Sequence, residues 1–130
     1  MAVLTASAAE QLDFEATSLT ISEIAEYLQY TVGQRVAAAI AGLADAKQIG
    51  RYARSHSRPH GTTERRLREG YKVIRMLADA YDATTAKAWL FGTNSRLDDQ
   101  APIEVLGAAT ESVDFTMVVQ AARQVASFQG

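Results

Sequence analysis

Few side chains in this sequence have the type and spacing that catalysis needs. His56 and His60 are four residues apart, as two metal ligands on a helix can be, but Pro59 lies between them and no carboxylate or cysteine accompanies them. Asp98 and Asp99 are adjacent, and adjacent carboxylates point in different directions. Neither a phosphate-binding loop nor a G-x-S-x-G turn is present. We predict that the protein is not an enzyme and holds no metal or cofactor.

Other roles are expected for these four side chains. The histidines fit phosphate contact or plain exposure to solvent. The two aspartates precede Pro102, which is expected near the first position of a helix, and a negative charge there interacts favourably with the helix N-terminus.

The positive charge is concentrated in the middle of the chain. Nine of the thirteen Lys and Arg residues lie between Lys47 and Arg75, where only Glu64 and Glu69 oppose them, so this segment carries +7. The rest of the chain has four cations and thirteen carboxylates and carries −9, and the formal net charge is −2. A net charge close to zero therefore conceals a basic segment that nucleic acid could contact.

The basic segment begins with two short predicted helices, at 31–43 and 46–54. Gly42 is expected to end the first and Asp45 to cap the second, an arrangement that predicts a helix-turn-helix. From Gly42 to Ile49 is seven residues, which implies a turn longer than the commonest one.

The second of these helices carries the residues expected to contact DNA. Lys47, Gln48 and Arg51 share its outer face, where Gln can read adenine and Arg can read guanine. Arg54, Arg58 and Arg65 are expected to contact phosphates. Two alternatives stay open for the basic segment: a solvated helix surface without a partner, and a surface that binds an acidic protein.

The remaining pattern predicts an all-α protein of six or seven helices, without strands. Residues 1–17 show weak periodicity and are expected to form a flexible or partly helical arm. Thr20 and Glu23 fit a capping box, and a long helix is expected from Thr62 or Thr63 to residue 82. A shorter helix is expected with Thr84 or Thr85 as its cap and Gly92 as its stop. A final helix over 112–128 is expected to turn six side chains inward: Val113, Met117, Val118, Ala121, Ala122 and Val125.

Composition supports this interpretation. The 130 residues include 24 alanines and only 2 prolines, which favours helix. There is no cysteine, and we see neither a secretory signal nor an apolar stretch of the ~20 residues that a membrane span requires. These features predict a cytoplasmic location.

Several motifs together resemble a known family. They are Ala88-Trp89-Leu90, Asn94-Ser95-Arg96-Leu97 and Pro102-Ile103-Glu104-Val105-Leu106, with "ERRLR" at 64–68 upstream. On these residues the chain resembles the Xre/MbcA/ParS-type antitoxins over roughly 31–126. The tryptophan that is frequent in the recognition helix of that family is Tyr52 here.

The resemblance implies two regions: helix-turn-helix DNA binding over 18–82 and toxin binding over 83–130. The implied partners are a RES-domain toxin, which consumes NAD⁺ or transfers ADP-ribose from it, and operator DNA. The antitoxin is implied to block the active site of the toxin and to repress its own operon, as a homodimer and within larger toxin–antitoxin assemblies. The alternative is a stand-alone helix-turn-helix regulator without a toxin.

Two groups of residues are expected in the C-terminal region. A structural core is expected from Trp89, Phe91, Leu97, Pro102 and Leu106, although a lone tryptophan can also anchor an interface. Toxin contacts are expected from Arg96, Asp98, Asp99, Arg123, Phe128 and Gln129.

Overall fold

A computed structural model describes residues 6–127 and confirms the all-α prediction: these residues form eight α-helices and no strand. Three short helices lie near the predicted helix-turn-helix: α2 (Ile21–Val32), α3 (Gln34–Ala41) and α4 (Lys47–Ala53). The longest helix, α5 (Gly61–Ala80), is followed by α6 (Ala83–Phe91), α7 (Pro102–Ala108) and α8 (Ser112–Ser127). No helix in this part of the chain is both long and apolar enough to span a membrane.

Of the two forms expected for the N-terminal arm, the described part has the helical one, α1 (Ala6–Ser18), and it packs against α5. Leu12 and Ala16 are buried, and Arg68 of α5 donates hydrogen bonds from Nη1 to the carbonyl oxygens of Ala16 (2.9 Å) and Leu19 (2.7 Å). The weak periodicity of this segment gave no sign of these contacts, because carbonyl acceptors leave no apolar pattern in the sequence. Residues 1–5 of the expected arm lie outside the described residues.

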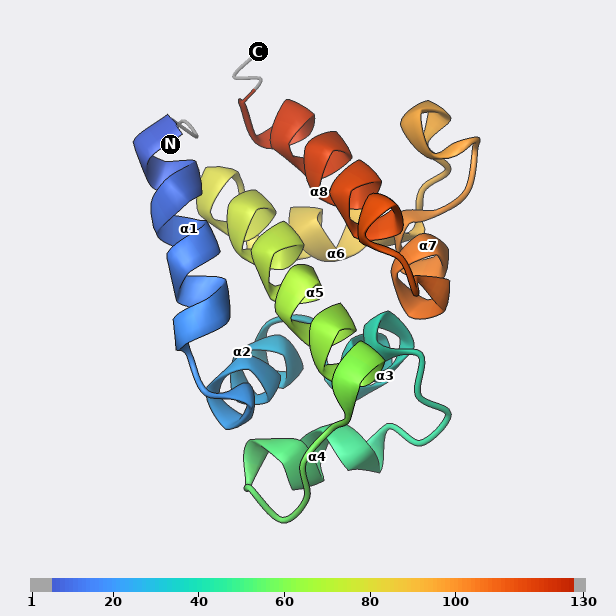
Figure 1. The fold of residues 1–130 in the computed structure, drawn as a ribbon. Helices are drawn as coiled ribbons and strands as arrows, with labels where there is room; N and C mark the ends of the chain where they lie inside the picture. The colour runs from blue at the N-terminus through green and yellow to red at the C-terminus, as the bar shows by residue number, and fades with distance from the viewer. Residues whose placement is uncertain (1–5, 128–130) are drawn as a thin grey trace.

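The helix α5 runs through the middle of the molecule, with α1 along one side and α8 along the other (Figure 1). It buries Leu67, Tyr71, Ile74 and Leu77. A single hydrophobic cluster runs from Leu12 to Ala126, so the core continues across the boundary that we expected at residue 82.

Local signals placed several helix ends correctly. Thr20 and Glu23 form the predicted capping box, Gly42 ends α3 with a left-handed φ of 74°, and Pro102 opens α7. The cap of α6 is Asp82, which accepts a hydrogen bond from the Thr85 N–H at 2.6 Å, so the expectation of a threonine cap is wrong. The long helix begins at Gly61, just before the expected Thr62 or Thr63.

The inward face predicted for α8 is partly wrong. Val118, Ala121 and Ala122 are buried, but Val113 is 60% exposed and Met117 is 39% exposed. The helix packs its Phe115–Val118–Ala122 face against α5, which turns Val113 and Met117 away from it.

Small residues allow α3 to approach α7 and α5 closely. A Cβ placed on Gly107 would lie 2.5 Å from the carbonyl oxygen of Ala39, and one on Gly70 would lie 2.5 Å from Cγ2 of Ile40. The first contact is with backbone, which cannot rotate out of the way. Gly107 therefore sets how closely α7 approaches α3.

We predict that Gly107→Ala lowers the free energy of unfolding by about 1–3 kcal/mol, because the two helices must move apart. Gly61→Ala is the matched control: no atom lies within 4 Å of its added Cβ, and its stability is expected to stay near that of the wild type. Urea unfolding followed by circular dichroism measures both. Equal stability of the two variants would contradict the close α3–α7 contact.

Candidate nucleic-acid interface

The turn between α3 and α4 is built by two local devices. At its start, the N–H of Gly42 donates to the carbonyl oxygens of Ala38 and Ala39. At its end, Oδ1 of Asp45 accepts a hydrogen bond from the Lys47 N–H at 2.9 Å. These contacts occupy backbone groups that a helix end otherwise leaves unpaired.

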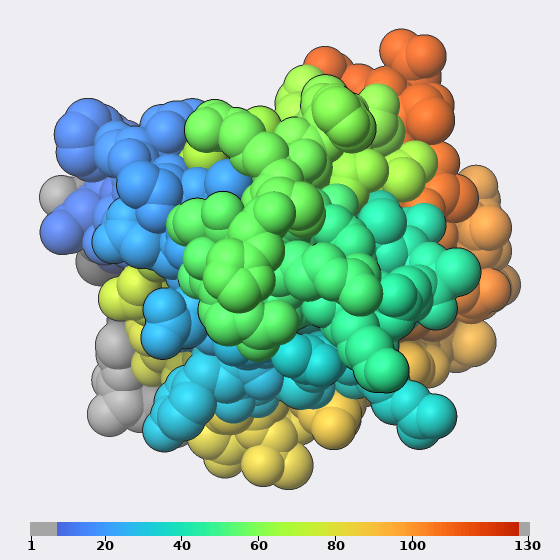
Figure 2. All heavy atoms as spheres, turned by 90° about the horizontal axis from the view of Figure 1, so that it is seen from below, coloured from blue at the N-terminus to red at the C-terminus, as the bar shows by residue number. Residues whose placement is uncertain are grey.

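The orientation of α4 is set by its contact with α2. Ile49, Gly50 and Tyr52 are buried, and the hydroxyl of Ser22 on α2 donates to the carbonyl oxygen of Ala53 at 2.6 Å. The opposite face of α4 is therefore turned to solvent. Figure 2 shows this end of the molecule, with α4 and the segment that leads into α5 at its centre.

The exposed face of α4 is positively charged. Lys47, Arg51 and Arg54 are exposed, and Arg58 is exposed in the loop that follows. From residue 46 to residue 63 the sequence contains four Lys or Arg residues and no Asp or Glu. The structure thus brings these four cations together with Gln48, which is half-buried. They are five of the six residues that we expected to contact DNA.

Three side chains at this face already bond to one another or to the adjoining turn. Nε2 of Gln48 donates to Oγ of Ser57 at 2.6 Å, and Oε1 of Gln48 accepts from Nη1 of Arg51 at 2.9 Å. The same Nη1 lies 3.5 Å from Oδ2 of Asp45. Sequence reasoning missed Ser57, because nothing in the local pattern links it to a residue nine positions earlier.

The other half of the basic segment lies on α5 and is used inside the protein. Arg66 donates from Nε to the carbonyl oxygen of Ala109 (2.9 Å) and from Nη1 to that of Ala41 (3.3 Å). Arg68 binds α1 and the chain after it, as described above, and also pairs with Glu64. The charge of +7 in the sequence is therefore not a single surface: α4 and its loop carry the exposed cations, while cations of α5 connect helices.

A polar cluster joins α1, α2 and α5 in the same way. Nη1 of Arg75 donates to the hydroxyl of Tyr71 (2.7 Å) and pairs with Glu15 (3.1 Å), and the ring of Tyr27 packs edge-on against that of Tyr71. Burial raises the pKa values of both tyrosines. Burial alone would lower the pKa of Arg75, but its hydrogen bonds and ion pair with Asp79 and the charges nearby raise it above its ordinary value. These contacts connect α1, α2 and α5.

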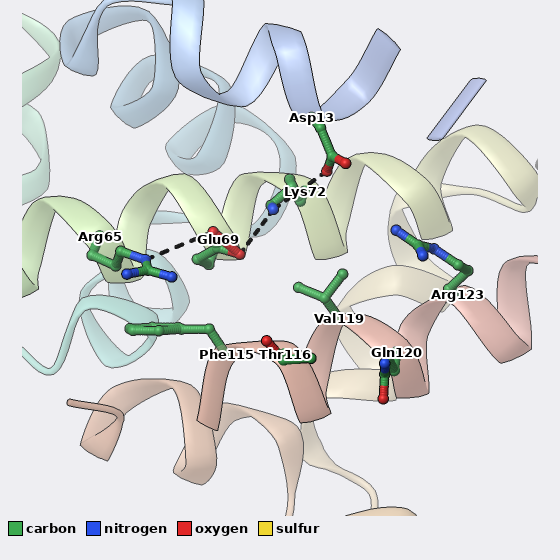
Figure 3. A pocket seen from close by; sticks show the side chains of 9 residues that line it. All are labelled: Asp13, Arg65, Glu69, Lys72, Phe115, Thr116, Val119, Gln120 and Arg123. Carbon is green, nitrogen blue, oxygen red and sulfur yellow. Dashed lines mark ion pairs between the residues drawn. The ribbon is translucent and has the colours of Figure 1, made fainter. Parts of the chain in front are cut away.

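Arg65 does not join the α4 group that we expected it to belong to. Its guanidinium lies 4.9 Å from the ring centroid of Phe115 on α8, and its Nε is 3.9 Å from Glu69. It marks one end of a groove of about 230 Å³ between α1, α5 and α8 (Figure 3). Lys72 spans the middle of this groove through ion pairs with Asp13 (3.3 Å) and Glu69 (3.0 Å).

The residues expected to contact a toxin are only partly brought together. Arg96 and Arg123 line one shallow hollow of about 420 Å³ with Gln120, Gln124 and Ser127. Nη2 of Arg96 donates to Oε1 of Gln124 at 3.3 Å. Arg123 also reaches over the groove of Figure 3, so the two hollows share it.

The other expected toxin contacts lie elsewhere. Asp98 and Asp99 are exposed and have left-handed φ values of 54° and 62°, at the end of a short 3-10 helix (Ser95–Leu97). Phe128 and Gln129 lie outside the described residues.

The expected C-terminal core needs one correction. Leu97, Pro102 and Leu106 are buried and Trp89 is partly buried against the core, but Phe91 is 55% exposed. Phe91 is the last residue of α6, where the helix has already turned this position away from the core.

The described residues contain no group of three or more His, Cys, Asp or Glu side chains that could hold a metal ion. Comparison of the chain with protein-family models, with curated proteins and with solved structures gave no match.

We predict that Arg66→Ala lowers the free energy of unfolding by about 1–3 kcal/mol, because two half-buried carbonyl groups lose their partner. Arg54→Ala is the control just after α4: the exposed side chain of Arg54 has no hydrogen bond or ion pair within residues 6–127, and its removal should leave the thermal unfolding midpoint within about 1 °C of the wild type. Thermal unfolding followed by circular dichroism compares the two. A larger loss in Arg54→Ala would contradict the division of the basic segment.

Proposed function

We propose that this protein binds DNA through α4 and acts as the antitoxin of a toxin–antitoxin pair. The observation that carries the DNA-binding part is the exposed face of α4 and its loop, which presents Lys47, Arg51, Arg54 and Arg58. The sequence from residue 46 to residue 63 contains no Asp or Glu. A short helix braced on its buried side and cationic on its outer side suits insertion into the major groove. Arg54 and Arg58, which follow the middle of this face in the sequence, would contact phosphates.

The antitoxin part depends on the sequence motifs of the C-terminal region. Ala88-Trp89-Leu90, Asn94–Leu97 and Pro102–Leu106 resemble the toxin-binding region of Xre/MbcA/ParS-type antitoxins. The proposed partner is a RES-domain toxin, whose NAD⁺-consuming or ADP-ribose-transferring site the antitoxin blocks. The protein would repress its own operon as a homodimer, because a two-fold symmetric protein matches a palindromic operator.

The toxin is proposed to bind at the hollow that Arg96 and Arg123 line. It contains two guanidinium groups and two glutamine amides and no carboxylate among its lining residues. Such a surface suits carboxylate groups of a partner, because a guanidinium can donate two parallel hydrogen bonds to one carboxylate.

The DNA-binding part predicts that the triple variant Lys47→Ala, Gln48→Ala, Arg51→Ala loses at least 100-fold in affinity for the DNA upstream of its own gene. Affinity of the wild type should fall steeply between 50 and 200 mM salt, because bound cations release counterions from the phosphates (on the order of 10-fold or more for a few contacts). Fluorescence anisotropy with a labelled duplex measures both. A salt-independent affinity, or a triple variant that binds normally, would remove DNA binding through α4 from the proposal.

The antitoxin part predicts that Arg96→Glu, Arg123→Glu no longer protects cells from the product of the adjacent reading frame, while it still binds DNA. Lys87→Glu is the control, because Lys87 is an exposed cation on α6 and does not line the hollow. Growth after co-expression and co-purification of the two proteins are the measurements. If the wild type neither protects nor co-purifies, the protein is a stand-alone regulator. If the double variant protects as well as the wild type does, the toxin binds another surface.

A further inference from the structure

Among the cations at the α4 face, Arg51 is the one whose side chain contacts both Gln48 and Asp45. We infer that Arg51 is the side chain of α4 that distinguishes guanine from other bases, and that Gln48, Ser57 and Asp45 are positioning residues that hold it. The inference rests on the proposed DNA binding and assigns the base contact within it.

Gln48 is poorly placed to read a base itself. A glutamine reads adenine by using its amide nitrogen and its amide oxygen together. In this structure the nitrogen donates to Oγ of Ser57 at 2.6 Å and the oxygen accepts from Arg51 at 2.9 Å. Both amide groups therefore already have a partner within the protein, and these two bonds and the partial burial hold the amide in one orientation.

Arg51 keeps one edge of its guanidinium open. Its contacts with Gln48 and with Asp45 both use Nη1, and no hydrogen bond or ion pair in the described part of the chain uses its Nε or Nη2. Nε and Nη2 carry two parallel N–H groups. That pair of donors matches O6 and N7 of guanine, the commonest specific contact of arginine in the major groove.

The supports of Arg51 are themselves anchored to the backbone and the loop. Oδ1 of Asp45 is held by the Lys47 N–H at 2.9 Å, which leaves Oδ2 on the side of Arg51 (3.5 Å). Ser57 fixes Gln48 from the loop after α4. The carboxylate of Asp45 also disfavours a phosphate beside Arg51, since two negative charges would then meet. Within residues 6–127, no hydrogen bond or ion pair holds the side chains of Lys47, Arg54 and Arg58, which suits them to phosphates.

The experiment selects bound duplexes from a random pool with the wild type, and then measures the affinity for the selected duplex and for versions with single base changes. We expect a required guanine in each half-site, with a loss of about 10- to 100-fold when it is replaced by adenine. Arg51→Ala should bind the guanine and the adenine duplexes equally. Arg54→Ala, the matched control on the same helix, should weaken all duplexes alike and keep the guanine preference.

The positioning residues are tested through the guanine-to-adenine affinity ratio, which a loss of overall stability would not change. Gln48→Met and Ser57→Ala should each reduce this ratio at least threefold. Ser57→Thr keeps the hydroxyl and should have the ratio of the wild type. Thermal unfolding checks that each variant is folded.

Three results would overturn the inference. One is an equal weakening of all duplexes by Arg51→Ala, which would make Arg51 a phosphate contact. Another is the loss of an adenine preference in Gln48→Met with the guanine preference intact. The third is an unchanged ratio in both Gln48→Met and Ser57→Ala. Failure of the wild type to bind any duplex would instead refute the proposed DNA binding, and the inference with it.

Discussion

The turn that leads into α4 begins where α3 ends, and one guanidinium ties that end to α5 and α7. Arg66 of α5 donates to the carbonyl oxygens of Ala41, at the end of α3, and of Ala109, just after α7. The last carbonyl groups of a helix have no partner within the helix, so a charged donor at this point satisfies them and joins three helices. Gly42 and Gly107 let the backbones approach closely enough for this.

The chain uses its positive charge in two ways that its sequence does not distinguish. On α5, arginine and lysine side chains bind carbonyl groups and carboxylates of other helices, as Arg68, Lys72 and Arg75 do. On α4 and its loop the buried side is apolar and the cations face water. A charge count over the whole segment therefore overstates the surface available to DNA, while the smaller α4 surface keeps almost only positive charge.

Elements that depend on neighbouring residues were predictable from the sequence. The capping box at Thr20, the left-handed Gly42 and the first-turn Pro102 each follow from contacts within a few residues. The interactions that decide the site were not predictable, because their partners are far apart in the sequence. Arg68 bonds to Ala16 across 52 positions and Arg65 bonds weakly to Ser112 across 47. Only the tertiary structure reveals which cations these contacts consume.

The sequence also did not predict which apolar residues are exposed, where a helix contacts its neighbours with only part of its apolar surface. Phe91, Val113 and Met117 fit an apolar helical pattern, but they face solvent because none of the described helices covers those positions. Burial of Leu97 and Leu106, in contrast, agrees with their places in the motifs of the C-terminal region.

The central claim is that DNA meets α4 and its loop, and not the cations of α5. Amide chemical shifts of the protein, recorded by NMR while a short duplex from upstream of its own gene is added, test this most directly. The account predicts that the largest changes fall between Asp45 and Arg58, with little change around Lys72 and Phe115. Changes centred on the groove between α1, α5 and α8, with α4 unaffected, would contradict it.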